Sequence, residues 1–89
     1  MSKFSLGQVV MTRGIADSDL NKEEIAKAVA RHSNGDWGNL PTEDKAMNDE
    51  AVISGEDRIL SAYVIDGEKI YVITEWDRSI TTILFPDEY

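Results

Sequence analysis

The sequence contains no cysteine and a single histidine, His32. Without cysteine the chain cannot form disulfides or thiolate metal sites, and a zinc site with one histidine would need several carboxylates. Glycine-rich phosphate-binding motifs and the acidic loop of calcium sites are also missing. We therefore expect neither a metal nor a cofactor. Because disulfides belong to oxidising compartments, the cytoplasm is the default expectation for its location.

Long apolar runs are missing as well. A helix that crosses a membrane needs about 20 consecutive apolar residues, and the unbroken apolar stretches of this chain are much shorter. The first residues, MSKFSLGQVV, lack the apolar run and the small-residue cleavage site of a signal peptide. We therefore expect no membrane segment and no signal peptide.

Basic residues are few, since 9 Lys and Arg stand against 17 Asp and Glu, for a net charge of −8. Direct binding of nucleic acid is disfavoured, because Lys and Arg at the phosphates supply most of that affinity. An acidic surface keeps a protein soluble, or attracts a basic protein surface in competition with DNA. The acids are spread along the chain, so the charge alone does not establish mimicry of nucleic acid.

The 89 residues, 42% of them hydrophobic and 29% charged, are typical of one globular domain over residues 1–89. Residues 4–12 predict a strand and residues 13–19 a loop. A helix is expected over 21–33, because Asn21 and Glu24 form a start signal and Asn34-Gly35 a stop signal. A second helix is expected from an N-cap at Thr42 to Ser54-Gly55. Its expected apolar stripe comprises Ala46, Met47 and Ala51.

The last third predicts an antiparallel meander. Strands 58–65 and 68–76 flank Asp66-Gly67, a strong hairpin signal, and strand 80–85 follows a corner at 77–79. The two-residue turns set the register expected for the pairs Tyr63–Ile70, Arg58–Glu75 and Thr74–Thr81. The fold class is thus α+β, in the order β-α-α-β-β-β, with both helices on one face of the sheet. Both faces are apolar, so the N-terminal strand, a second copy or a partner must cover the surplus.

The stretch RHSNGDWG, residues 31–38, places the only histidine, a tryptophan and an aspartate within one short segment. Its structural interpretation is a helix end: His32 caps the last turn, Asp36 bonds the turn backbone and Trp37 packs beneath the loop. Its functional interpretation makes His32 a general acid or base. The residues satisfy the structural interpretation without requiring the functional one.

A second polar cluster, TEWDRSITT, covers residues 74–82. Arg78 would bind a phosphate or carboxylate there, and Thr81 or Thr82 would donate to an oxyanion. The structural alternative is a tight turn capped by Asp77, with Glu75 neutralised by Arg58 across the ladder.

Four blocks carry a family resemblance: LGQVVMT (6–12), RHxxGDWGxLxxEDKxxNDxA (31–51), GxDRxLSAY (55–63) and KIYVITEWDRSxTTILFPDEY (69–89). Together they span nearly the whole chain, which resembles a family of small uncharacterised bacterial proteins found on plasmids, integrative elements and phages. The resemblance implies an accessory protein of a mobile genetic element, with interference with host defence as one role.

Three hypotheses follow. The first is an acidic protein that binds a basic nucleic-acid-handling partner, as anti-restriction and anti-CRISPR inhibitors do, through the exposed edge of the meander. Its expected binding residues are Glu75, Asp77, Arg78, Asp87, Glu88, Asp36 and Trp37.

The second hypothesis is a metal-independent ribonuclease, similar in layout to the barnase–EndoU–colicin–RelE group. His32 would transfer protons, Arg78 would stabilise the phosphorane, and Thr81 or Thr82 would position the phosphate. The net charge of −8 argues against an RNA substrate. The third is a homodimer without catalysis, paired through the last strand.

Overall fold

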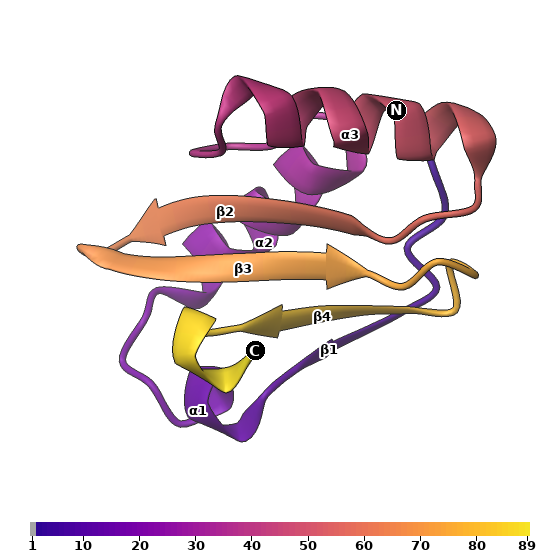
Figure 1. Ribbon diagram of the computed structural model, residues 1–89. Helices are drawn as coiled ribbons and strands as arrows, with labels where there is room; N and C mark the ends of the chain where they lie inside the picture. Colours follow the sequence, from indigo (N-terminus) through magenta and orange to yellow (C-terminus); the bar gives the residue numbers. More distant parts are fainter. Residues whose placement is uncertain (1) are drawn as a thin grey trace.

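The computed structural model describes residues 2–89 as a four-stranded sheet with helices around it (Figure 1). The elements are β1 (Gln8–Met11), α1 (Arg13–Ala16), α2 (Lys22–Ser33), α3 (Thr42–Ser54), β2 (Ile59–Ile65), β3 (Glu68–Thr74), β4 (Ile80–Leu84) and the 3-10 turn η1 (Pro86–Glu88). The α+β class and the order of the main elements are confirmed. The expected loop after β1 instead contains α1, because the Thr12 hydroxyl caps it and Ile15 is fully buried.

The sheet has the strand order β1-β4-β3-β2. The meander β2-β3-β4 is antiparallel in the expected register, with Tyr63 opposite Ile70 and Thr74 opposite Thr81. β1 pairs with β4 in parallel, so the sheet is mixed and is not a pure meander. The last strand is therefore interior, and the expectation that it forms a free edge for pairing with a second copy is wrong.

The helix α2 follows its sequence signals closely. The Asn21 side chain accepts hydrogen bonds from the Glu23 and Glu24 amides at 2.9 and 3.2 Å, which caps the N-terminus. Gly35 follows the last turn with a φ of +82°. One side of α2 packs on the sheet and forms the main core with residues of α1, β2, β3 and β4. Its buried members are Ile15, Leu20, Ile25, Ala28, Tyr63, Ile65, Ile70, Val72 and Ile83.

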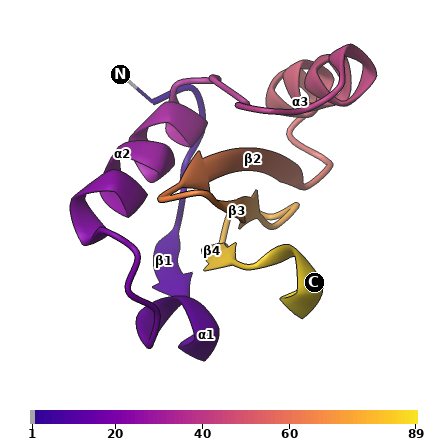
Figure 2. The same ribbon diagram turned by 90° about the vertical axis from the view of Figure 1, so that its left-hand side faces the viewer.

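The helix α3 differs from its expectation in both start and position. Its N-cap is Pro41, with no side-chain cap, and Thr42 is its first residue. Figure 2 shows α2 beside one face of the sheet and α3 along β2, displaced toward the other side, so the two helices do not share a face. The predicted apolar stripe fails because Met47 is 69% exposed; the buried residues of α3 are Asn48 and Ala51.

The outer edge of β2 is closed by groups from two other segments. The Asn48 side chain donates to the Leu60 carbonyl at 2.7 Å and accepts from the Leu60 amide at 3.2 Å. Further along, the Ala62 amide donates to the Trp37 carbonyl and the Asn39 amide to the Ala62 carbonyl. The expected exposed meander edge is therefore occupied at Leu60 and Ala62, because these bonds satisfy main-chain groups that would otherwise face solvent.

A smaller core lies between α3 and the sheet, where Trp37, Ala51 and Ile59 are buried together. It joins the RHSNGDWG segment to the start of β2. No helix in the described part of the chain, residues 2–89, is both long and apolar enough to span a membrane.

Candidate functional site

The RHSNGDWG segment is a structural corner. Arg31 grips the Asp36 carboxylate with two nitrogens, Nε at 2.7 Å and Nη2 at 3.2 Å, and this contact is the main reason that the pKa of Asp36 is lowered. The Tyr63 hydroxyl donates to the Asp36 carbonyl. Trp37 is only 4% exposed, and its indole donates to Asp49 at 2.9 Å. The segment thus anchors the turn between α2 and α3, as its structural interpretation predicts for Asp36 and Trp37. The expectation that His32 caps the last turn is wrong, because its ring nitrogens bond Ser61 and Thr74 of the sheet.

His32 is fully buried, packed edge-on against Phe4 and Trp37. Its Nδ1 meets the Ser61 hydroxyl and its Nε2 lies 2.9 Å from the Thr74 hydroxyl. Burial lowers the pKa of His32 to about 4, because the charged ring would lose its hydration. At neutral pH the ring is uncharged, and both of its nitrogens are occupied.

The chain of hydroxyl groups beyond His32 fixes which nitrogen holds the proton. Thr81 donates its single hydroxyl hydrogen to the Leu6 carbonyl at 2.7 Å, so it accepts the bond from Thr74. Thr74 has then used its hydrogen and must accept from Nε2–H of His32. In the neutral ring Nδ1 is consequently the acceptor, and Ser61 donates to it. The Leu6 carbonyl, the last acceptor in this series of hydrogen bonds, thus determines the tautomer of His32.

The guanidinium of Arg78 donates hydrogen bonds to main-chain carbonyls. Nη1 donates to the carbonyls of Asp57 at 2.6 Å and Trp76 at 3.1 Å, and Nη2 donates to that of Ala51 at 2.9 Å. The residue itself has a φ of +60° in the turn between β3 and β4. Arg78 therefore ties the end of α3, the segment before β2 and this turn together.

The carboxylates expected to form a binding surface lie at separate places. Asp77 caps its own turn by accepting from the amide and hydroxyl of Ser79, whose hydroxyl bond is the main cause of a lowered pKa of Asp77. Glu88 accepts from the Phe85 amide and the Thr12 hydroxyl, and the Phe85 bond is the larger cause of its lowered pKa. The turn with Asp77 precedes β4, and η1 with Glu88 follows it. These two acids therefore lie at opposite ends of β4 and do not converge.

The remaining predicted residues are equally dispersed. Asp87 is exposed on η1, Glu75 is half-buried after β3, and Thr82 is half-buried on β4 opposite Ile73. Arg58 was expected to neutralise Glu75. Its guanidinium lies instead 5.0 Å from the centre of the Tyr89 ring, and no ion pair joins it to Glu75 among residues 2–89.

In the ribonuclease hypothesis His32 transfers the protons, and the structure leaves this residue without access to solvent. His32, Thr74 and Thr81 do come together, but in a buried chain that ends on a main-chain carbonyl. An acid–base residue must reach the proton that it transfers, either directly or through one water. The ring of His32 has 0% exposure and both nitrogens bonded, which favours a structural role.

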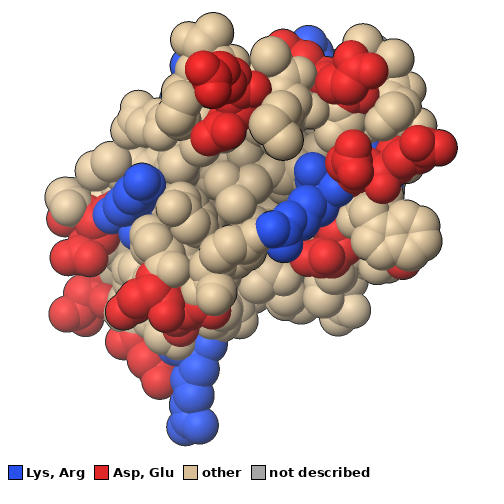
Figure 3. Space-filling view, viewed as in Figure 1, with Lys and Arg blue, Asp and Glu red and all other residues tan. Residues whose placement is uncertain are grey.

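A groove of about 540 Å³ lies between α3 and β2, on the face of the sheet that carries Leu60. This volume lies in the range of ordinary binding pockets. We call it the α3 groove; it is lined by Leu40, Asp44, Met47, Asn48, Glu50, Asp57, Arg58 and Leu60. Figure 3 shows an uncharged area on this side of the molecule, with both acidic and basic side chains around it.

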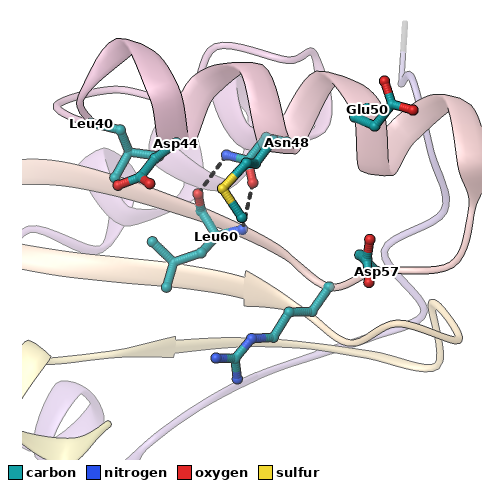
Figure 4. Close-up of a pocket in the computed structure, with 8 residues that line it drawn as sticks. Leu40, Asp44, Asn48, Glu50, Asp57 and Leu60 are labelled. Atoms are coloured by element: carbon teal, nitrogen blue, oxygen red, sulfur yellow. Dashed lines mark hydrogen bonds between the residues drawn. The ribbon is translucent and has the colours of Figure 1, made fainter.

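The groove combines an apolar floor with carboxylates at its rim. Leu40, Met47 and Leu60 supply apolar surface. Asp44 and Glu50 extend from different turns of α3, and Asp57 lies across from Glu50 before β2 (Figure 4). The single lining cation is Arg58. Such a surface suits an apolar ligand that also carries positive charge.

The sequence reasoning missed this groove because it assigned Met47 to the core and treated the acids of α3 as a solvated face. The spacing of the apolar residues in α3 did indicate that this helix lacks a single apolar face. The apolar residues of α3 include the consecutive run Ala51, Val52 and Ile53, which spreads around the helix and does not form one stripe. A helix without a clear apolar face buries little, and Ile53 is indeed 82% exposed.

Comparison of the chain with models of protein families, with curated proteins and with solved structures gives no match. The resemblance to proteins of mobile genetic elements therefore stays a prediction. In the part of the chain that the structure describes, no three His, Asp or Glu side chains gather as a metal site would require.

Proposed function

We propose that this protein acts by binding another protein, and that the α3 groove takes a basic segment of that partner. The observation that carries the proposal is the composition of the groove, in which three acidic residues, one cation and an apolar floor form the lining. An apolar side chain of the partner would pack against Leu40, Met47 and Leu60. Lys or Arg side chains next to it would reach Asp44, Glu50 and Asp57.

Exposed apolar side chains support an interface at this place. Met47 is 69% exposed within the groove, and methionine is enriched in protein interfaces. Trp76 is 62% exposed, and Arg78 Nη1 bonds both its carbonyl and that of Asp57. The tryptophan therefore stands near the acidic end of the groove, where it would serve as an aromatic anchor.

The net charge of −8 extends this proposal to the class of partner. Opposite potentials steer the encounter of two proteins and make its rate dependent on salt. A surface that binds nucleic acid is rich in Lys and Arg, because these side chains neutralise the phosphates. We therefore infer that the partner is a nucleic-acid-handling protein, and that this protein blocks its basic surface. The resemblance to mobile-element proteins favours an inhibitor of host defence, of the anti-CRISPR or anti-restriction type.

The test is capture of partners from a bacterial lysate on the immobilised protein, with mass spectrometry of what is retained. Three forms are compared: the wild type, a groove variant with Glu50→Lys and Asp57→Lys, and a control with Asp19→Lys and Glu23→Lys. All four positions are exposed and the two variants change the charge equally. We expect one basic protein to be retained by the wild type and the control and to be lost from the groove variant and in high salt.

The captured protein is then purified and its binding to nucleic acid is measured with increasing amounts of each form. The proposal requires that the wild type and the control displace the nucleic acid and that the groove variant does not. Equal loss of capture in both variants would show that total charge matters and the groove does not. Retention of a partner that still binds its nucleic acid would contradict the inhibitor role.

A further inference from the structure

The two edge strands of the sheet, β1 and β2, differ in whether their outward main-chain groups have partners. The outer edge of β2 is closed by Asn48 and by the segment from Trp37 to Asn39. The outer edge of β1 is open. The amides of Gln8 and Thr12 donate to β4, at Ser79 and Ile83. Because main-chain groups alternate along a strand, those of Val9 and Met11 point away from β4, toward the free side of the sheet.

An apolar strip accompanies this open edge. Val9 is 46% exposed and Met11 is 41% exposed, although their partners across the ladder, Thr81 and Ile83, are buried. The reason is that α2 makes its main contacts with the sheet at β2 and β3 and not at β1. A partner at this edge would gain both main-chain hydrogen bonds and apolar contact.

The charge distribution indicates that the partner is a second copy. No acid precedes Asp17, so the first sixteen residues carry only Lys3 and Arg13 in a chain of net charge −8. The strand itself, QVVM, is short but has no charge and no proline, two of the usual devices that keep edge strands apart. The strand itself therefore brings no like charge to a contact between two acidic molecules, and Glu88, which bonds Thr12, is an acid just beyond its end.

We propose that the protein forms a two-fold dimer in which β1 pairs antiparallel with β1 of a second copy. Val10 lies on the two-fold axis, and Val9 of each copy faces Met11 of the other. The outward main-chain groups of both residues are then satisfied, and their exposed side chains share one apolar patch. Because the β2 edge is closed, association stops at the dimer and does not continue into a fibre.

The arrangement has a consequence for the α3 groove. The two-fold axis of such a continuous sheet is perpendicular to the strands' plane, so equivalent surfaces of both copies lie on the same face. The dimer therefore presents two grooves on one face, at the two outer edges of the joined sheet, because β2 and β1 are opposite edges of each copy. A partner with two basic segments, or a partner that is itself dimeric, would gain affinity from binding both.

The first test is the mass of the protein in solution across a wide concentration range, by sedimentation equilibrium. The wild type is compared with Val9→Lys and with Val64→Lys. Val64 is a matched control, because it is an exposed strand valine on β2. We expect a dimer for the wild type and for Val64→Lys. Val9→Lys should be a monomer, because a lysine at the edge would be desolvated by pairing.

A second test locates the contact and uses the lack of native cysteine. In the proposed register the two Val10 Cα atoms are about 4.5 Å apart, a non-hydrogen-bonded antiparallel pair, which a disulfide spans. Val10→Cys should cross-link quantitatively under mild oxidation, whereas Val64→Cys should not. A wild type that is monomeric at every concentration overturns the proposal and leaves the edge to a strand of another protein. A dimer that tolerates Val9→Lys and fails to cross-link through Val10→Cys overturns it as well.

Discussion

At the scale of single residues, the most constrained side chain is His32. It has no exposed surface, and each ring nitrogen meets a hydroxyl group of the sheet. Protonation of the ring would turn Nδ1 into a donor that faces Ser61, which already donates to it. The buried network therefore favours the neutral ring, because an added proton would lose its hydration and would force the Ser61 hydroxyl to accept from Nδ1 and direct its hydrogen elsewhere.

This arrangement predicts a pH-dependent stability. The pKa of His32 is about 4 in the folded protein and 6.5 in the unfolded chain, so between these values the unfolded chain binds more protons. The stability that the neutral ring contributes is complete above pH 6.5 and is lost as the pH falls toward 4. The loss approaches about 3 kcal/mol, at 1.36 kcal/mol per pKa unit. Urea unfolding of the wild type and of His32→Gln over this range measures it as the difference between the two.

Nuclear magnetic resonance provides a control that requires no variant. Nitrogen chemical shifts of the His32 ring should show the Nε2–H tautomer throughout neutral pH and a titration midpoint near 4. A midpoint near 6.5 would contradict the lowering of the His32 pKa by burial. An Nδ1–H tautomer would contradict the direction of the hydrogen bonds assigned to Ser61 and Thr74.

At the scale of elements, α3 and the preceding loop act as a cover for the edge of β2. Asn48 replaces a neighbouring strand by bonding both main-chain groups of Leu60. Gly38 forms a parallel bridge with Ala62. A side chain at Gly38 would overlap the Ala62 carbonyl oxygen, so the close approach of the two backbones requires glycine.

Two glycine substitutions separate crowding from backbone strain. Gly38 and Gly55 have nearly equal φ values of +73° and +69°, but a Cβ at Gly55 would meet no atom within 4 Å. Gly55→Ala should cost about 1–2 kcal/mol, the cost of the left-handed conformation. Gly38→Ala should cost about 2 kcal/mol more, because the bonds between the loop and Ala62 are lost. Urea unfolding compares them, and equal losses would show that the bridge contributes no stability.

At the scale of the whole molecule, the net charge of −8 sets up repulsion that the few ion pairs do not offset. The ion pairs among residues 2–89 are Arg13–Asp17, Lys27–Glu24 and Arg31–Asp36, all substantially exposed. Exposed pairs contribute at most about 1 kcal/mol each. Screening by salt should therefore weaken repulsion more than attraction.

We expect the free energy of unfolding at pH 7 to rise with sodium chloride. The same titration near the isoelectric point, about pH 4.4, is the control. There the net charge vanishes, and the salt dependence should vanish with it. A stability that is independent of salt at pH 7, or that rises equally at both pH values, would show that self-repulsion is not a significant term.

The sequence by itself determined the parts that depend on neighbouring residues. The Asn21 cap and the Gly35 stop bound α2, and Asp66-Gly67 fixes the register that places Tyr63 opposite Ile70. The structural interpretation of the RHSNGDWG corner was equally accessible, because its main ion pair joins residues five positions apart. Caps, turns and helix periodicity act within a few residues, which is the range over which a sequence pattern can be interpreted.

Only the tertiary structure decided where these elements lie. The parallel pairing of β1 with β4 joins opposite ends of the chain, and Asn48 reaches Leu60 from a helix whose apolar residues suggested another orientation. Arg78 looked like a phosphate ligand in the sequence and instead binds four carbonyls. Two of them, those of Ala51 and Asp57, are distant in the chain and only folding brings them near. The α3 groove and the open β1 edge exist for the same physical reason: contacts between distant residues place α3 beside the sheet and leave one strand uncovered.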